Sequence, residues 1–249
     1  MQILSPQTVS VSELTSTVQQ KGYAVLSATQ VADWAGCTVD ALQALSPHWD
    51  HMPPDNYLKD GGRYRRRLHS SFVLDHGSLA QVPHRAHWQS VDYNALHGGM
   101  ERWFEPMRHS TVTAPAWIKL LTAFAGTAAQ VRGISASKWC IEAHQFRIDT
   151  TDGIGRPTPE GAHRDGVDFV GVFMVNRTDI KGGETRVFEA NGPHGERFTL
   201  HEPWSLLLLD DTRVIHESTP IQPLAEGGHR DTLVLTCRAD KFQDAEPSA

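Results

Sequence analysis

The chain has 249 residues, of which 39% are hydrophobic and 21% are charged, and this is the composition of a globular protein. Its formal net charge of −6 argues against a nucleic-acid partner, which would require a basic face. No apolar run reaches the length of a membrane span, and the first residues lack the basic and apolar segments of a signal peptide. The cysteines, Cys37, Cys140 and Cys237, are far apart, which is typical of reduced thiols, so we expect a cytoplasmic protein without a membrane partner.

The first half of the chain mixes helices with strands. A short helix is predicted to begin after Ser12 as its N-cap and to stop at Gly22. Four further elements are expected in chain order: a strand at Tyr23–Leu26, a helical stretch at Thr29–Pro47, a strand at Arg63–Asp75 and a helix at Ala114–Val131. In the last of these, Pro115 near the start and an apolar stripe that includes Trp117 and Phe124 indicate a helix that packs on a core.

From residue 137 onward the sequence changes to short runs rich in β-branched and aromatic residues. Seven such runs are separated by turn-forming segments, at residues 137–149, 167–177, 183–190, 196–202, 204–211, 212–218 and 230–238. Consecutive strands without intervening helices predict an antiparallel sandwich or barrel. We therefore expect a mainly β fold with flanking helices (α+β) on a jelly-roll, cupin-like core. Residues 1–249 are expected to form a single domain, in which a helix-rich part (1–135) packs on a core (136–240) that carries the metal site.

Three His-x-Asp sequences occur in a chain with 14 histidines, so the pattern alone has little meaning. His48-Trp49-Asp50 lies in a loop, and His229-Arg230-Asp231 begins the last predicted strand, with only a tail after it. His163-Arg164-Asp165 also begins a predicted strand, but four more strands follow it. One of these carries a lone histidine, His216, about fifty residues beyond Asp165.

The positions of His163, Asp165 and His216 suit a non-haem iron site. Fe(II) oxygenases bind iron through two histidines and one carboxylate, which leaves three positions for the cosubstrate and O2. Residues two apart on a strand point the same way, so His163 and Asp165 can both reach one ion, and a later strand of a barrel can bring His216 alongside. We predict a metal site at these three residues, with Phe169 and Phe173 on the same face as an apolar lining.

The last predicted strand adds a cation to this site. Arg230 and Thr232 alternate onto one face of the strand, whereas Leu233 and Leu235 take the other. An arginine and a hydroxyl on the inner face can hold the far carboxylate of a dicarboxylic acid, because the guanidinium pairs with a carboxylate in a bidentate manner. A salt bridge at the strand end is the alternative, but the position soon after a candidate iron ligand favours a binding role.

Four segments together resemble the bacterial 2-oxoglutarate/Fe(II) dioxygenases similar to L-isoleucine 4-hydroxylase: PTPEGAHRDGVDF, GGET, DDTRVIHESTPI and HRDTLVLT. The resemblance covers the last half of the chain strongly and the first half only in outline. It implies a double-stranded β-helix, the cofactor Fe(II), the cosubstrate 2-oxoglutarate and O2. It also implies that His163, Asp165 and His216 hold the iron and that Arg230, with Thr232 beside it, anchors 2-oxoglutarate. The implied partner is a small molecule, a free aliphatic L-amino acid, as the substrate.

Other polar residues are weaker candidates for substrate binding. Gln145 and Arg147 share one face of a strand, which points either into the cavity or into solvent. Glu160 and Asp168 flank the His163 motif, and each is either a ligand for a substrate ammonium or an ordinary surface carboxylate. The run Arg65–Arg67 is expected to be a solvated strand edge, with the alternative that one of these arginines reaches a carboxylate. Four histidines are expected to be surface or packing residues: His69, His76, His84 and His87.

Two alternatives to amino acid hydroxylation remain open. One is a 2-oxoglutarate-dependent hydroxylase of a peptide or protein residue, and the other is a non-catalytic, cupin-like protein that binds a metal or a small molecule. A kinase catalytic loop is disfavoured because Gly166 follows the His-Arg-Asp sequence and Val170 stands where the loop requires Asn. A serine hydrolase is also disfavoured, because the sequence contains no G-x-S-x-G elbow.

Overall fold

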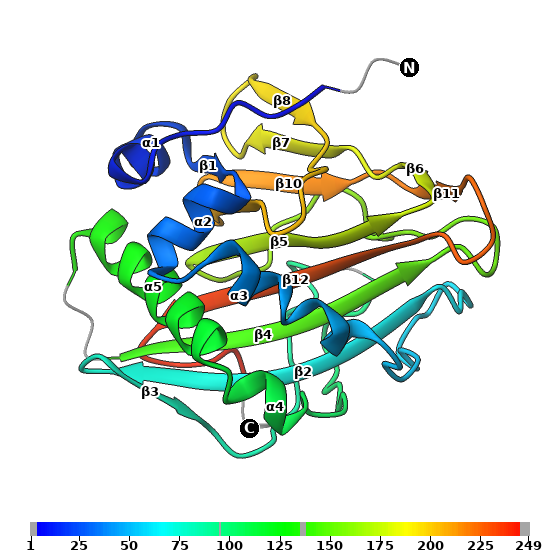
Figure 1. The fold of residues 1–249 in the computed structure, drawn as a ribbon, viewed down its shortest axis with the longest axis horizontal. Helices are drawn as coiled ribbons and strands as arrows, with labels where there is room; N and C mark the ends of the chain where they lie inside the picture. The colour runs from blue at the N-terminus through cyan, green and yellow to red at the C-terminus, as the bar shows by residue number, and fades with distance from the viewer. Residues whose placement is uncertain (1–3, 95, 135–137, 245–249) are drawn as a thin grey trace.

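The computed structural model describes residues 4–94, 96–134 and 138–244, and its largest element is a seven-stranded antiparallel sheet (Figure 1). The strand order in this sheet is β1-β9-β5-β12-β4-β2-β3. These strands are β1 Tyr23–Leu26, β2 Arg65–Asp75, β3 Ser78–Gln81, β4 Lys138–Asp149, β5 Phe169–Thr178, β9 Leu206–Asp210 and β12 His229–Ala239. Because β12 lies at the centre, between β5 and β4, its residues are positioned from both sides.

Two smaller sheets complete the β core. The first, β10-β7-β8, is built from β7 Thr185–Glu189, β8 Gly195–Phe198 and β10 Val214–Ser218. The second pairs β6 Ile180–Gly182 with β11 Ile221–Pro223. Strands that are distant in the sequence pair across these sheets, and the whole is the predicted jelly-roll architecture with flanking helices. The short strands β3, β6 and β11 are additions to the predicted set.

Helices cover one face of the large sheet, and Figure 1 shows α2, α3 and α5 in front of its strands. The helical segments are η1 Val11–Glu13, α1 Leu14–Lys21, α2 Ala28–Ala35, α3 Val39–Gln43, η2 Ser46–Trp49, α4 His109–Val112 and α5 Pro115–Arg132. Trp117 and Phe124 of α5 are fully buried in one cluster with Phe72 and Leu235 of the sheet. The apolar stripe predicted for this helix therefore forms its contact with the sheet.

The other face of the large sheet packs on the small sheets and bounds a cavity. Met174 of β5 joins Val187 and Val214 of the three-stranded sheet in a second buried cluster. Phe169 and Phe173 of β5 lie in the helix-side core instead, which corrects the prediction that they line the metal site. Bends at residues 166–168 separate Asp165 from the strand, so the alternation of faces does not continue across them.

The helix boundaries follow local chain chemistry. Gly22, with a φ of 80°, ends α1 as predicted, because glycine adopts the left-handed conformation without a steric penalty. The start differs, because Ser10 caps a short 3-10 turn ahead of α1 and Ser12 does not act as the cap. The stretch at residues 29–47 is divided at Gly36, whose φ of 67° ends α2.

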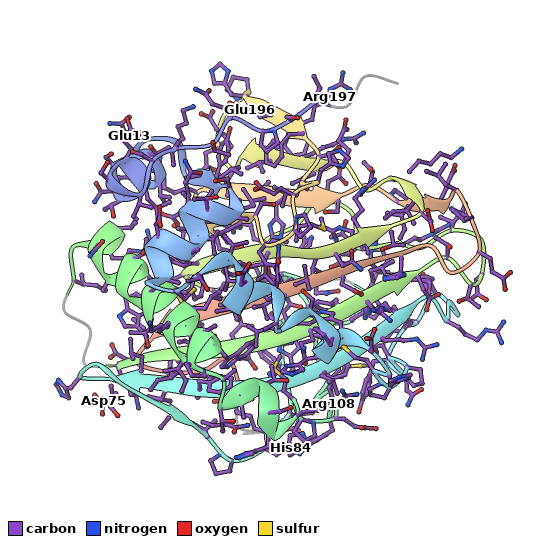
Figure 2. All side chains as sticks on the ribbon, in the orientation of Figure 1. Glu13, Asp75, His84, Arg108, Glu196 and Arg197 are labelled. Atoms are coloured by element: carbon purple, nitrogen blue, oxygen red, sulfur yellow. The ribbon has the colours of Figure 1, made fainter. Side chains whose placement is uncertain are left out.

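Charged residues are found at the rim of the fold as well as in its interior. Figure 2 shows Glu13, Asp75 and Glu196 at the outer edge of the molecule, where all three are exposed. His76 and His84 are exposed as well, as predicted.

The packing of α5 can be tested with Phe124→Ala. Phe124 is 0% exposed, so its truncation should lower the free energy of unfolding by about 3–5 kcal/mol through lost burial and a residual cavity. The measurement is denaturant unfolding followed by circular dichroism. The matched control is Ile118→Ala on the same helix, where Ile118 is 41% exposed and the change should be within about 0.5 kcal/mol. Equal losses for both variants would contradict this account of the core.

Candidate metal centre

His163 and His216 are adjacent on two antiparallel segments. His163 precedes β5 and forms an isolated bridge with His216 in β10. The backbone N–H of each residue donates to the carbonyl oxygen of the other over 3.0 Å. Their imidazole rings lie 4.7 Å apart, centroid to centroid. Two histidines that are distant in the sequence are thus held side by side by a pair of backbone hydrogen bonds.

Asp165 completes a group of three potential ligands. Its Oδ1 lies 3.7 Å from Nε2 of His163, and its Oδ2 lies 3.9 Å from Nε2 of His216. One ligand atom from each of the three residues lies within 4.8 Å of the others, so a single ion can contact all of them. The structure therefore brings together the three residues that spacing alone singled out.

Hydrogen bonding prepares the two imidazoles for a metal ion. Nδ1 of His163 donates to the carbonyl oxygen of Gly161 over 2.9 Å, so Nε2 is the ring nitrogen that faces Asp165 and that can bind an ion when its proton is lost. Nδ1 of His216 is buried and has no hydrogen-bond partner in the described part of the chain. Two imidazoles and one carboxylate are the donor set of non-haem Fe(II) oxygenases. These residues therefore fit an Fe(II) ion.

The charges of the group also favour a cation. Burial lowers the pKa of His163, but the hydrogen bond and charge of Asp165, together with Glu160, raise it to about 10. Burial and the neighbouring His163 lower the pKa of His216 to about 4. Although burial raises the pKa of Asp165, the hydrogen bond and charge of His163 and the charge of His216 bring it below its usual range. Asp165 is therefore ionised at neutral pH, as a metal ligand must be.

Asp211 fixes the backbone on which Asp165 is carried. Its carboxylate accepts hydrogen bonds from the N–H groups of Asp165, Gly166 and Val167, over 2.9, 2.7 and 3.1 Å. Gly166 has a φ of 77°, so the turn depends on a residue without a side chain. The sequence analysis missed Asp211, although its place in the Asp-Asp pair shortly before His216 was a usable signal.

Arg230 and Thr232 lie on the cavity side of β12, in the same cavity as the three potential ligands. Arg230 is 3% exposed, and its Nε and Nη2 atoms have no partner among the described residues. Burial and the nearby Arg177 lower its pKa to about 10, so the group is still charged at neutral pH. Leu233 and Leu235 pack on the helix-covered face, as predicted. A buried guanidinium without an ion-pair partner suits an anionic ligand.

Three predicted substrate-binding residues lie outside the cavity, and these predictions are corrected. Phe146 of β4 lines the cavity, so Gln145 and Arg147 point to the opposite side of the sheet. Arg147 forms an ion pair with Asp231, with 2.7 Å between Nε and Oδ1. Asp168 is not part of the cavity wall either, and its carboxylate accepts a hydrogen bond from the backbone at the end of β12. Alternation grouped the residues of β4 into two faces but did not indicate which face is the inner one.

Glu160 does line the cavity. Its Oε1 lies 3.6 Å from Nε2 of His163, and its side chain is 13% exposed. Its Oε2 is buried without a hydrogen-bond partner among the described residues. Of the four predicted substrate-binding residues, Glu160 therefore presents an unused acceptor to an enclosed space next to the candidate metal ligands.

Two of the three arginines in the run of β2, Arg65 and Arg67, are buried, which corrects the prediction of a solvated edge for them. Arg65 and Arg67 are each 5% exposed, and both line the cavity. Nε of Arg65 donates to Oδ2 of Asp55 over 2.7 Å. Arg66, between them, points away and lies 3.5 Å from a carboxylate oxygen of Asp149. The inner face of β2 thus carries charge because the cavity it faces is polar.

A second cluster of potential ligands supports this wall. The cluster consists of His69, His87, Glu142 and His144, all buried, with ligand atoms within 4.8 Å of one another. Nη2 of Arg67 lies 3.0 Å from Nδ1 of His144, and Nη1 of Arg85 lies 3.6 Å from Glu142. Two guanidinium groups at this distance repel a cation. We therefore interpret the cluster as a hydrogen-bonded network that holds the cavity wall.

A model of the 2OG-Fe dioxygenase family matches residues 46–236, a range that includes all three potential ligands and Arg230. The chain belongs to this family. It is accordingly a 2-oxoglutarate-dependent non-haem iron oxygenase, with Fe(II) as the cofactor and 2-oxoglutarate and O2 as cosubstrates. The donor set at His163, Asp165 and His216 agrees with that chemistry.

Solved structures of similar proteins share the fold of this dioxygenase. A BsmA homologue from Methylobium petroleophilum PM1 is 49% identical, with 99% of this chain and 100% of that chain covered and a TM-score of 0.92. IDO from Bacillus thuringiensis is 18% identical, with 96% and 100% covered and a TM-score of 0.75. The Fe(II)/α-ketoglutarate-dependent dioxygenase TqaL is 19% identical, with 92% and 87% covered and a TM-score of 0.69. A search of curated proteins finds no match to the chain.

The helices of this dioxygenase are too short or too polar to span a bilayer, within the part of the chain that the structure describes. The longest of them is α5, and its apolar face is occupied by the sheet.

Substitution of the potential ligands tests the metal centre of the dioxygenase. His163→Ala, Asp165→Ala and His216→Ala should each abolish stoichiometric Fe(II) binding and turnover, because each removes one of three protein ligands. The measurement is anaerobic Fe(II) titration with metal analysis after desalting, alongside circular dichroism to check the fold. The control is His48→Ala in the His-x-Asp sequence of the loop, where Nδ1 of His48 lies 2.9 Å from the Thr111 hydroxyl. Loss of iron from the His48 variant and retention by the His163 variant would show that the wrong motif was chosen.

The supporting role of Asp211 gives a graded test. Asp211→Ala should weaken Fe(II) binding about 10- to 100-fold without removing a ligand, because three backbone donors lose their shared acceptor and the Asp165 turn loosens. Asp211→Asn keeps one acceptor oxygen and should fall between the wild type and the Ala variant. The measurement is the dissociation constant for Fe(II) under anaerobic conditions. Identical constants for all three proteins would contradict this role.

Proposed function

We propose that this dioxygenase hydroxylates an unactivated C–H bond of a free aliphatic L-amino acid. In this proposal His163, Asp165 and His216 hold Fe(II), and Arg230 holds 2-oxoglutarate. The bound iron supplies the oxidising chemistry by which one atom of O2 enters the substrate while 2-oxoglutarate becomes succinate and CO2. The observation that carries the proposal is a cavity that joins the potential iron ligands, an unpaired arginine and an unpaired carboxylate oxygen.

The assignment of Arg230 to the cosubstrate rests on charge and geometry. Its guanidinium is buried with two unpartnered nitrogen atoms, and a carboxylate can accept two parallel hydrogen bonds from such a group. The hydroxyl-bearing Thr232 lies two residues along the same strand face and also lines the cavity. We assign the distal carboxylate of 2-oxoglutarate to this pair. The keto acid end then lies toward the three potential ligands of the metal.

Glu160 supports an amino acid as the substrate. A substrate ammonium needs an acceptor of negative charge, and Oε2 of Glu160 is buried and unused beside His163. The apolar part of the cavity wall suits an aliphatic side chain, since Ile148, Val172 and Val234 contribute to it. The cavity measures about 120 Å³, a scale that favours small ligands over a folded protein segment.

A peptide or protein substrate is the alternative enzymatic function, and a non-catalytic binding protein is the alternative without catalysis. A peptide residue has no free ammonium, so it would leave Oε2 of Glu160 unpaired. Because leaving Oε2 of Glu160 buried and unpaired is unfavourable, a free amino acid is the better supported substrate.

The proposal is tested with a panel of free L-amino acids, each incubated with the Fe(II) enzyme, 2-oxoglutarate and O2. We expect succinate release coupled to a product heavier by one oxygen atom for one or more aliphatic members, detected by mass spectrometry. A pocket distinguishes a single methylene by only about 1–3 kcal/mol, so several members should react. Turnover of an N-acetylated, C-amidated residue in preference to every free amino acid would favour the peptide hydroxylase. Iron binding without oxygen uptake for any member would favour the non-catalytic protein.

The cosubstrate anchor is tested with Arg230→Lys. Lysine keeps the charge but cannot form two parallel bonds, so 2-oxoglutarate binding should weaken by roughly 1.5–3 kcal/mol, about ten- to a hundredfold. The measurement is a 2-oxoglutarate titration of the anaerobic Fe(II) enzyme, followed by the metal-to-ligand absorption band. Arg147→Lys is the matched control, because Arg147 lies on the opposite face of the sheet and should give the wild-type midpoint. A wild-type midpoint for Arg230→Lys would make Arg230 a structural residue.

A further inference from the structure

Two buried arginines of the cavity wall have no carboxylate partner. Arg67 on β2 is 5% exposed, and Arg102 in the segment between β3 and α4 is 2% exposed. Both line the cavity, and the Nε atom of each has no hydrogen-bond partner among the described residues. Arg65 beside them differs, because its Nε is paired with Asp55. Within the described part of the chain, neither Arg67 nor Arg102 forms an ion pair.

The guanidinium of Arg67 is held in place although it has no carboxylate partner among the described residues. Arg67 lies over the rings of Phe104 and Phe146, at 4.0 and 4.6 Å from their centroids, and Nη2 contacts His144. Contact with two aromatic rings restricts its movement and favours its charged form. A rigid guanidinium loses little conformational entropy when an anion binds, which is the property of a prepared binding site.

Arg102 is connected to the candidate metal centre. Its backbone pairs with that of His87 over 2.9 Å in both directions, and its Nη2 donates to Oε1 of Gln89 over 3.4 Å. The amide nitrogen of the same Gln89 donates to Oδ1 of Asp165 over 3.2 Å. One glutamine side chain therefore spans from Arg102 to a potential iron ligand, which places this arginine close to the reacting centre.

Burial and neighbouring positive charges both disfavour the charged forms of Arg67 and Arg102. Burial, followed by the repulsion of Arg65, lowers the pKa of Arg102 to about 10, whereas Asp55, Glu160 and Glu142 act in the other direction. Burial also lowers the pKa of Arg67, and Arg102 adds to the effect. Cations that repel one another in a buried wall gain stability when an anion binds between them.

We propose that Arg67 and Arg102 form a second anion-binding subsite, distinct from Arg230, which takes the carboxylate of the substrate. The inference rests on the proposed function, in which the substrate is a free amino acid and Arg230 is used by 2-oxoglutarate. A carboxylate can accept two parallel hydrogen bonds from a flat guanidinium group such as that of Arg67, which packs on two aromatic rings. Glu160 then receives the ammonium group, and the charges of Arg102 and Glu160 are near enough to influence one another. The anion-binding subsite and Glu160 together recognise the carboxylate and the ammonium group of an α-amino acid.

The subsite is tested with two probes that each carry half of the amino acid. The carboxylate probe is 4-methylvalerate, which lacks an ammonium group, and the ammonium probe is L-leucinamide, which lacks a carboxylate. Binding is measured by calorimetry on the anaerobic enzyme loaded with Fe(II) and 2-oxoglutarate, so that Arg230 is occupied. Arg67→Met and Arg102→Met should each weaken 4-methylvalerate binding at least tenfold and leave L-leucinamide binding within about threefold of wild type.

Matched variants keep the test decisive. Arg66 lies on the same strand as Arg67 but faces Asp149. The Arg66→Met variant should therefore bind 4-methylvalerate like the wild type. Arg102→Met is the independent variant if Arg67→Met fails to fold, and the melting temperature of each protein is measured first. The proposal is overturned if the wild type does not bind 4-methylvalerate, or if both Met variants bind it with the wild-type constant. Weakened 2-oxoglutarate binding in Arg67→Met, with normal binding in Arg230→Lys, would also overturn it, because the two subsites would be exchanged.

The same measurements separate this inference from the proposed function. If no free amino acid is hydroxylated but 4-methylvalerate binding still depends on Arg67 and Arg102, the anion subsite holds and the amino acid substrate is wrong. If amino acids are hydroxylated and the Met variants keep wild-type Michaelis constants and 4-methylvalerate affinity, the function holds and the subsite is wrong.

Discussion

The backbone pairing of His163 with His216 is the contact on which the rest of the site depends. Two hydrogen bonds of 3.0 Å join the segment that enters β5 to the strand β10, and no side chain is needed to hold them. Each such bond contributes only about 1 kcal/mol to stability, but together they set the distance between the two imidazoles. Asp165 then needs only a fixed turn, which Asp211 provides. Backbone geometry thus determines how the three potential ligands are arranged.

The residues that could be predicted from the sequence are those governed by short-range patterns. His163 and Asp165 are two positions apart at a strand start, and His216 is isolated in a later strand, so ligand chemistry was enough to select them. Arg230 and Thr232 followed from the alternation of faces along β12, where Leu233 marks the apolar side. The helix α5 and the β-rich second half were predicted for the same reason, since their apolar periodicity is local.

The residues that could not be predicted depend on which face of a strand is the inner one. Alternation along β4 separated Gln145 and Arg147 from their neighbours, but the identity of the inner face is decided by strand pairing with β2 and β12. Arg65 and Arg67 were predicted to be solvated because charged residues are usually exposed. They are buried because they line a polar cavity inside the fold. Asp211 was missed because its partners are backbone N–H groups, which no motif identifies, and the Asp-Asp pair before His216 was the one signal that pointed to it.

The alternation of charge along β12 ties function to strand register. Arg230 faces the cavity, whereas the next residue, Asp231, faces away and pairs with Arg147. A shift by one residue would exchange the two faces along the whole strand and place a carboxylate where a guanidinium stands. Pairing with β5 already contains an irregularity between Asp231 and Thr232, while pairing with β4 is continuous. A single-residue insertion or deletion within β12 would therefore be opposed by electrostatics as well as by packing.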